Sequence, residues 1–173
     1  DVHQAKNSAL AIEIFHNFTL LHDDIMDEAP LRRGQATVHE KWDTNSAILS
    51  GDAMMIQAYQ TLSKSDKIGT LLPVFNKVAI EVCEGQQNDM ITNKTSVLLG
   101  AALQLGAIEA DASKEEAQHL YDFGKNIGIA FQIQDDVLDA YGDSEKFGKR
   151  VGGDIVSNKK TYLLIIAKQK SNP

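Results

Sequence analysis

The stretch QAKNSALAIEIFHNFTLLHDDIMD, residues 4–27, combines a helical pattern of apolar residues with an acidic end. Its apolar positions recur every three or four residues, the period of an amphipathic α-helix, at Ala5, Ala9, Ile12, Phe15 and Leu20. Pro30 follows soon after and interrupts the pattern, because proline cannot continue a helix. The stretch therefore predicts a long helix whose C-terminal end carries a group of carboxylates.

Helical spacing continues along the rest of the chain, and strand-like alternation is essentially absent. Ser113 and Glu116 form the S-x-x-E pattern of a capping box, which predicts the start of a helix that runs to Asp139. The residues from Leu31 to Gln35 are expected to form a loop or a helix-ending turn. Further helices are predicted over residues 45–62, 71–89, 97–108 and 161–168. These patterns predict an all-α fold in a single domain over residues 1–173.

Composition limits the classes of protein to which the chain can belong. With 173 residues and 43% hydrophobic content, it can bury a core of its own. A net charge of −7 disfavours nonspecific nucleic-acid binding, which needs clustered lysine and arginine. The lone Cys83 excludes an intramolecular disulfide, and no apolar run approaches the roughly 18 residues that cross a bilayer. We therefore expect a cytoplasmic protein without stable membrane insertion.

The acidic end of the first predicted helix has a second copy later in the chain. The first acidic cluster is Asp23-Asp24-Ile25-Met26-Asp27, and the second is Asp135-Asp136-Val137-Leu138-Asp139. On a helix, residues i and i+4 share a face, so each cluster places like charges side by side. Both follow apolar residues, among them Phe18 and Phe131, so we expect the acids to interrupt buried stripes. Carboxylates without cysteine or paired histidine suit Mg²⁺, and the duplication predicts a magnesium site.

Basic residues follow each acidic cluster at short range. Arg32 and Arg33 come just after the first cluster, and Lys149 and Lys159 follow the second cluster beyond several glycines. Guanidinium groups match phosphate oxygens bidentately, and glycines let backbone amides approach an anion. Carboxylates for Mg²⁺ followed by bases for phosphate together predict a polyphosphate site.

Several spaced motifs together resemble the trans-isoprenyl diphosphate synthases, the polyprenyl synthetase family, of the short-to-medium chain farnesyl and geranylgeranyl type. The matching segments are His16–Asp27, Leu31–Gly34, Glu84–Gln86, Lys94–Thr95, Phe131–Asp139, Gly142–Asp143 and Gly148–Lys149. The resemblance implies a bundle of helices around a central cavity, with the two acidic clusters facing each other at its mouth. It implies a prenyltransferase of isoprenoid biosynthesis, which condenses isopentenyl diphosphate head-to-tail with an allylic diphosphate, and a homodimer.

The resemblance also assigns roles to residues. Up to three Mg²⁺ ions, with Mn²⁺ as a substitute, would be held by Asp23, Asp27, Asp135 and Asp139, with support from Asp24 and Asp136. The allylic diphosphate would contact Arg32, Lys94, Lys149 and Lys159, and the isopentenyl diphosphate would contact His16 and Arg33. Thr95 and Gln132 would lie beside the reacting carbons. Charge stabilisation on the leaving diphosphate, the main catalytic effect, would come from Asp23, Asp27, Arg32, Lys94, Asp135 and Lys149.

The length of the product is expected to depend on residues just before the first acidic cluster. Thr19 and Phe18 lie four and five positions before Asp23, about one turn deeper along the helix and on roughly its face. In the family a bulky residue at that depth stops chain growth. Phe18 therefore implies a C15–C20 product, which Phe18→Ala is expected to lengthen. Aromatic residues at helical spacing are also often ordinary core, and that interpretation stays open.

Three departures from the family pattern indicate that the chain is part of a longer protein. No glycine-lysine-arginine motif precedes Asp23, few residues separate Asp89 from Lys94, and the chain stops soon after Lys168. We expect residues to be missing at both termini and near residues 90–91. The site for isopentenyl diphosphate is then incomplete in this chain.

Other interpretations stay open beside this one. A longer-chain polyprenyl diphosphate synthase would share the same motifs. A di-iron carboxylate protein of the helical-bundle class would use the pairs Glu13-x-x-His16 and Glu116-x-x-His119, but it leaves both acidic clusters unexplained. A terpene cyclase would carry only one such cluster, and a noncatalytic partner subunit usually loses aspartates that this chain keeps.

Overall fold

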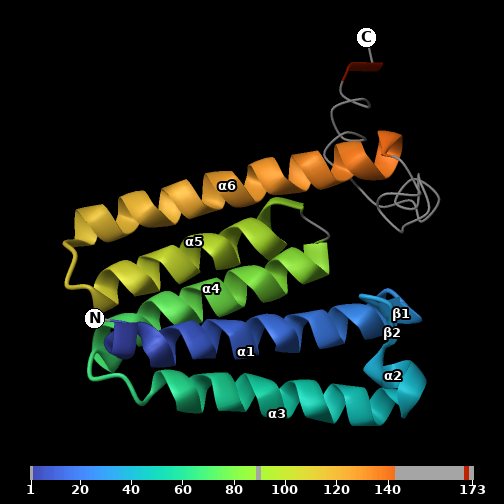
Figure 1. Cartoon of the computed structure of the whole chain (residues 1–173), viewed down its shortest axis with the longest axis horizontal. Helices are drawn as coiled ribbons and strands as arrows, with labels where there is room; N and C mark the ends of the chain where they lie inside the picture. The colour runs from blue at the N-terminus through green and yellow to red at the C-terminus, as the bar shows by residue number, and fades with distance from the viewer. Residues whose placement is uncertain (1, 89–90, 143–169, 172–173) are drawn as a thin grey trace. The chain divides into compact units, whose positions relative to one another are not determined.

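The computed structural model describes residues 2–88, 91–142 and 170–171, with side chains described in residues 5–85, 96–142 and 170–171. These residues form helices and one small hairpin (Figure 1). The helices are α1 (Val2–Met26), α2 (Val38–Lys41), α3 (Thr44–Leu62), α4 (Ile68–Asn88), α5 (Ile91–Glu109) and α6 (Lys114–Tyr141). The strands are β1 (Leu31–Arg32) and β2 (Gln35–Ala36). The predicted all-α fold is confirmed.

Most predicted helices form with boundaries shifted by a few residues. The helix predicted over residues 97–108 begins earlier, at Ile91, and the start of α6 at Lys114 agrees with Ser113 as its N-cap. The sequence pattern does not predict α2, because four residues are too few to show a period. The helix predicted over 161–168 lies outside the described residues. None of the described helices has the length and apolar content needed to cross a membrane.

The predicted loop after α1 is a hairpin instead. Arg32 pairs with Gln35 in antiparallel register, and the two residues between them form the turn. Arg33 and Gly34 have φ of +52° and +77°, the left-handed conformation that a type I′ turn requires at both positions. The sequence does not indicate this turn, because arginine rarely adopts positive φ.

Two compact units divide the chain. Residues 1–74 and 105–114 form the first unit, and residues 75–104 and 115–173 form the second. The buried apolar residues of the first unit include Phe15, Leu62, Leu71 and Leu105, and those of the second include Phe75, Val78, Val97 and Ala101. The expectation of a single domain over residues 1–173 stays a prediction.

In the first unit, α1 packs alongside α3 (Figure 1). His22 joins them, since its Nε2 lies 3.3 Å from the carbonyl oxygen of Ile48 and its ring occupies the space that a Cβ would need at Gly51. At the other end of α1, the buried carboxylate of Glu109 accepts hydrogen bonds from the hydroxyl groups of Ser8 and Ser65. These contacts hold α1 at both ends and fix where the first acidic cluster lies within the unit.

In the second unit, α6 leaves one apolar face uncovered. Phe131 is 60% exposed, and Phe123 and Ile127 on the same face are 58% and 44% exposed. The expectation that Phe131 belongs to a buried stripe is therefore wrong for the described part of the chain, in which nothing covers this face.

Candidate functional site

The first acidic cluster lies where α1 ends. Ala29 N–H donates to the carbonyl oxygen of Asp24 at 2.9 Å, and Glu28 N–H donates to that of Ile25 at 3.2 Å. Glu28 has a φ of +49°, so these bonds form a Schellman motif with Glu28 in the position that glycine usually takes. This closure stops the helix after Met26 and leaves the carboxylates of the cluster around its last turn.

Arg32 of β1 binds Asp24 through a bidentate ion pair. Its Nε donates to Oδ1 at 2.8 Å and to Oδ2 at 2.9 Å, and its Nη2 lies 2.7 Å from Oδ1. Asp24 is only 6% exposed, so the guanidinium offsets the cost of burying a carboxylate. Both oxygens of Asp24 are engaged by arginine, and a role for Asp24 in metal binding stays a prediction.

The other charges of the first acidic cluster also act on Arg32. The hydrogen bond to Asp24 raises the pKa of Arg32 above its usual value, and the negative charges of Asp24, Asp23 and Asp27 raise it further. Nη2 of Arg32 lies 4.0 Å from Oδ2 of Asp23. A helix C-terminus carries partial negative charge, so aspartates there repel both the helix dipole and one another. Arg32 offsets part of this repulsion.

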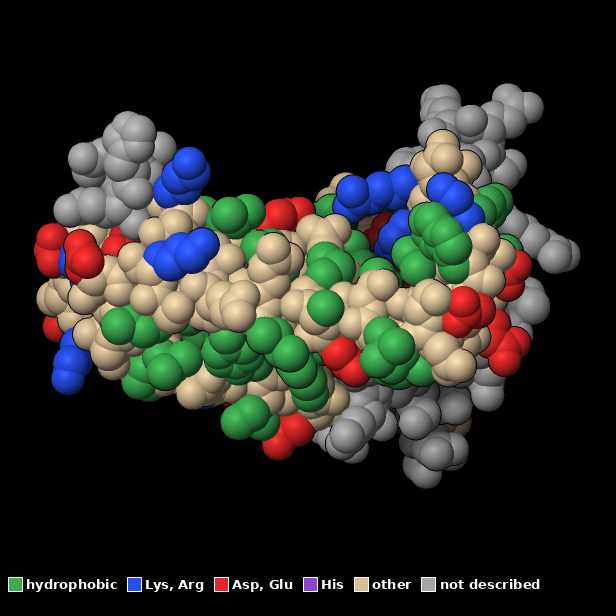
Figure 2. Space-filling model, turned by 90° about the horizontal axis from the view of Figure 1, so that it is seen from below, with side chains coloured by type: hydrophobic (Ala, Val, Ile, Leu, Met, Phe, Trp, Pro, Cys, Tyr) green, Lys and Arg blue, Asp and Glu red, His purple; other side chains and the backbone are tan. Residues whose placement is uncertain are grey.

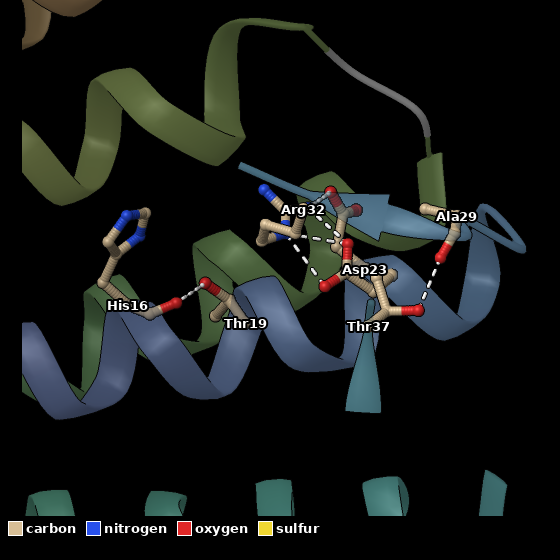
Figure 3. A network of polar contacts seen from close by, with 7 residues as sticks. His16, Thr19, Asp23, Ala29, Arg32 and Thr37 are labelled. Carbon is tan, nitrogen blue, oxygen red and sulfur yellow. Dashed lines mark hydrogen bonds and ion pairs between the residues drawn. The ribbon is translucent and has the colours of Figure 1, made fainter. Parts of the chain in front are cut away.

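Asp23, Asp27, Thr19 and His16 share one face of α1. Successive residues of a helix are about 100° apart around its axis, so Asp27 and Thr19 each lie about 40° from Asp23, and His16 lies about 20° from it. Thr19 Oγ1 donates to the carbonyl oxygen of His16 at 2.7 Å (Figure 3). The structure thus brings four of the predicted site residues onto one surface of α1.

Phe18 lies on a different face. It is about 140° from Asp23 around the helix axis. Its side chain is 7% exposed, and its ring packs against the rings of Phe15 and His22 at centroid distances of 5.4 and 4.8 Å. The expectation that Phe18 shares the face of the first aspartate is wrong, because five residues are almost one and a half turns. Its effect on product length stays a prediction.

A pocket of about 230 Å³ lies on the Asp24 side of α1, between α1, the hairpin and α3. Its lining comprises Asn17, Leu20, Leu21, Asp24, Arg32, Arg33, Ala36, Thr37, Val38 and Met54. Thr37 fixes the hairpin against the end of α1, since its Oγ1 donates to the carbonyl oxygen of Ala29 at 2.7 Å (Figure 3). The lining of the pocket therefore combines apolar residues with three charged ones, Asp24, Arg32 and Arg33.

The lining of this pocket includes three residues without a predicted role, Asn17, Thr37 and Met54. No periodic or charged pattern marks them, because the pocket forms only when the hairpin folds back onto α1 and α3.

The second acidic cluster lies near the C-terminal end of α6. Gln132, Asp135, Asp136 and Asp139 fall within about 100° of one another around the helix axis, so they share a broad face. Oε1 of Gln132 is buried and has no hydrogen-bond partner among the described residues. Buried amide oxygens are normally paired, so this atom indicates that a donor from a ligand or another segment belongs next to it.

The carboxylates of both clusters suit the open coordination of Mg²⁺ better than a metal site made only of protein ligands. Among the described side chains, no group of three or more histidine, cysteine, aspartate or glutamate residues is arranged to hold a metal ion. Mg²⁺ commonly takes only one or two carboxylates and completes its coordination with water and substrate phosphates. Asp23 and Asp27, which share a face of α1, match this mode of binding.

Four predicted site residues lie where the structure describes no side chains. Lys149 and Lys159 lie outside the described residues, and Lys94 and Thr95 belong to α5 but their side chains are not described. The expectation that the two acidic clusters face each other across a cavity also stays a prediction.

Comparison with known proteins gives close matches along the whole chain. A short chain isoprenyl diphosphate synthase of Methanocaldococcus jannaschii is 42% identical over 96% of this chain and 57% of its own length. A geranylgeranyl diphosphate synthase of Methanosarcina mazei is 40% identical over 94% of this chain and 56% of its own length. The chain thus spans a little more than half the length of the curated relatives that it matches.

Solved structures of similar proteins also match this chain along most of its length. A crystal structure of a geranylgeranyl pyrophosphate synthase is 55% identical, with a TM-score of 0.90 over 94% of this chain and 55% of that one. Geranylgeranyl pyrophosphate synthetase from Pyrococcus horikoshii is 40% identical, with a TM-score of 0.91 over 100% of this chain and 58% of that one. The family model described as polyprenyl synthetase matches residues 1–173. The chain belongs to the polyprenyl synthetase family.

Proposed function

We propose that the protein is a Mg²⁺-dependent prenyltransferase, which condenses isopentenyl diphosphate head-to-tail with an allylic diphosphate. The observation that carries the proposal is the pairing of the first acidic cluster with Arg32, because it sets carboxylates for a cation beside a guanidinium for a phosphate. The names of the relatives support the same chemistry, since they are synthases of isoprenyl and geranylgeranyl diphosphates.

In this proposal the charged residues act on the diphosphate that leaves. Asp23 and Asp27 would hold Mg²⁺, with Asp135 and Asp139 serving the same purpose on α6, and the ion would supply positive charge at the departing oxygen. Arg32 is fixed by Asp24 and offers its remaining N–H donors to phosphate oxygens. Because these groups are already oriented, they stabilise the developing charge without reorganising.

The reaction then needs little more from the protein. The C–O bond of the allylic diphosphate breaks, the alkene of isopentenyl diphosphate forms the new C–C bond, and a proton leaves the product carbon. The released diphosphate can accept that proton, so no side chain has to act as a base. Thr95 and Gln132 are proposed to lie beside the reacting carbons, and the unpaired Oε1 of Gln132 is compatible with a polar contact there.

The second substrate is proposed to use the hairpin. Arg33 lies at the tip of the turn and lines the pocket beside α1. A guanidinium at the edge of an apolar pocket suits a molecule with a diphosphate head and a short hydrocarbon. His16 is proposed to help, although it does not line this pocket; Lys94, Lys149 and Lys159 are proposed for the allylic diphosphate.

A product of C15–C20 is proposed. The relatives' names include farnesyl (C15) and geranylgeranyl (C20) diphosphate synthases, which lie at the two ends of this range, and a geranylfarnesyl (C25) diphosphate synthase, which lies beyond it. Thr19 shares the face of Asp23 and is the better placed of the two candidate residues to meet a growing chain.

A second copy of the chain is the proposed partner. On α3, Leu49 is 68% exposed, Ile56 is 57% exposed and Ile48 is 39% exposed. Figure 2 shows apolar side chains on the side where α3 lies. Covering such residues with the same surface of another copy would form a two-fold interface. Location in the cytoplasm stays a prediction.

The di-iron alternative is not favoured. Glu13 is exposed and its carboxylate accepts a hydrogen bond from Asn17, while Glu116 and His119 are exposed. A buried di-iron centre would need these carboxylates to point inward together.

The test is a Mg²⁺-dependent elongation assay with the full-length protein, isopentenyl diphosphate and C5, C10 or C15 allylic primers. We expect head-to-tail products of C15–C20 that disappear when EDTA removes the metal and return with Mg²⁺ or Mn²⁺. Absence of elongation with every primer refutes the proposed activity, and products well beyond C20 favour a longer-chain synthase.

A further inference from the structure

In the second unit, α5 and α6 meet at backbone distance along three glycines. A Cβ at Gly100 of α5 would lie 2.8 Å from the carbonyl oxygen of Tyr121. A Cβ at Gly124 of α6 would lie 2.8 Å from the carbonyl oxygen of Leu99 and 2.9 Å from Cα of Gly100. Real Cβ atoms essentially never come within 3.0 Å of such atoms. The two helices can therefore lie this close only because the glycines have no side chain.

The tightest of these contacts is at Gly128, against Ser96. A Cβ at position 128 would lie 2.9 Å from Cβ of Ser96, 3.2 Å from its backbone nitrogen, and nearer still to its Cα. The obstructing atoms belong mainly to the backbone of α5, so a change of side-chain rotamer cannot relieve the clash. Any larger residue at position 128 must push the two helices apart.

This contact lies between two groups of proposed site residues. Gly128 is one turn before Gln132 on the same face of α6, and two turns before the second acidic cluster. Ser96 directly follows Lys94 and Thr95 along α5. Within the described part of the chain, the buried Oε1 of Gln132 on this face of α6 has no hydrogen-bond partner.

We propose that Gly128 is a positioning residue, whose contact with Ser96 sets the distance between the Gln132–Asp139 turns of α6 and the start of α5. The proposal rests on the proposed prenyl transfer. Ordinary van der Waals contact begins near 3.4 Å, so a methyl group at position 128 moves the helices apart by on the order of 1 Å. Displacement by this amount can lower a rate about 100-fold when it misaligns reacting groups.

The experiment compares three glycine-to-alanine variants of the full-length protein. Gly106→Ala is the matched control, because it lies in α5 and has nothing within 4 Å of its Cβ position. We expect Gly106→Ala to leave kcat unchanged, Gly124→Ala to lower it about 3- to 10-fold, and Gly128→Ala to lower it about 30- to 100-fold. KM for isopentenyl diphosphate should change less than about threefold, since His16 and Arg33, which are proposed to bind it, are untouched.

A purely structural role gives a different result. Gly128→Ala would then lower the melting temperature but keep the wild-type kcat at temperatures well below melting, and that outcome overturns the proposal. A crystal structure of Gly128→Ala with an unchanged distance between Cα of residue 128 and Cα of Ser96 overturns it as well. That structure is informative even if the wild-type protein shows no elongation, in which case the proposed function fails separately.

Discussion

Replacing Asp24 with asparagine separates two roles that an aspartate of the first acidic cluster can have, the orientation of Arg32 and the binding of a metal ion. Asp24→Asn keeps the size of the side chain but removes its charge and one of the two acceptors that bind Arg32. An exposed ion pair contributes less than about 1 kcal/mol, and losing one partner of a fully buried pair costs about 3–5 kcal/mol. Asp24 is 6% exposed but the Arg32 side chain is 36% exposed, so we expect a loss of about 2 kcal/mol in the free energy of unfolding.

Asp23→Asn is the matched control, because Asp23 is the neighbouring carboxylate and lies 4.0 Å from the same guanidinium. Urea unfolding should show no comparable loss for Asp23→Asn, since it relieves repulsion within the cluster. Calorimetric titration of Mg²⁺ in the presence of diphosphate should show weakened metal binding for Asp23→Asn and nearly unchanged binding for Asp24→Asn. The freed Arg32 should raise KM for the allylic diphosphate about tenfold, the equivalent of about 1.4 kcal/mol.

A double-mutant cycle measures the pairing directly. Arg32→Gln combined with Asp24→Asn should destabilise the protein by about 1–2 kcal/mol less than the sum of the single changes, because each single change already breaks the pair. Strictly additive losses refute the pairing. Metal binding by Asp24→Asn that is as weak as that of Asp23→Asn refutes the positioning role and makes Asp24 a ligand.

Three further predictions follow from single contacts. Thr19→Phe should shorten the product in the elongation assay. Phe18→Ala should mainly lower the free energy of unfolding by about 3 kcal/mol, because it leaves a hole in the core. A longer product from Phe18→Ala would instead place the Phe18 ring in the wall of the cavity that holds the growing chain. Hydrogen bonds from Ser46 lower the pKa of Asp43, the N-cap of α3, so Asp43→Ala should reduce stability at neutral pH. Denaturant curves of variant and wild type should converge as the pH falls through the lowered pKa. A difference in the free energy of unfolding that stays constant with pH contradicts this prediction. Burial, followed by the charge of Glu81, raises the pKa of Tyr121 to about 12. The difference in ultraviolet absorbance between wild type and Tyr121→Phe should therefore titrate near that pH. Because this tyrosine ionises at lower pH in the unfolded chain, the free energy of unfolding should fall between about pH 10 and 12.

The sequence predicts the helices well, because their signal is local. The 3.6-residue period locates α1 and α3 to within a few residues, and Ser113 marks the start of α6. It also predicts that Asp23, Asp27 and Thr19 share a face, because helix geometry alone settles that question.

Contacts between distant segments are not predictable in the same way. The hairpin needs Arg33 in a left-handed conformation, which no local preference favours, and the Asp24 pair forms only after this hairpin folds back. The close approach of Gly128 to Ser96 depends on how α5 and α6 cross, a property of packing that is absent from either helix alone.

The D-D-x-x-D pattern therefore contains a division of roles that follows from the helix itself. Its first and last aspartates are four residues apart and lie about 40° from each other, whereas the middle aspartate is about 100° from the first. The three carboxylates of a regular helix cannot all reach the same ion, so the middle carboxylate meets a different environment. In the first cluster that environment is Arg32, which the middle aspartate orients. The same helix geometry applies to Asp136 in the second cluster, which lies about 100° from Asp135 around the axis of α6.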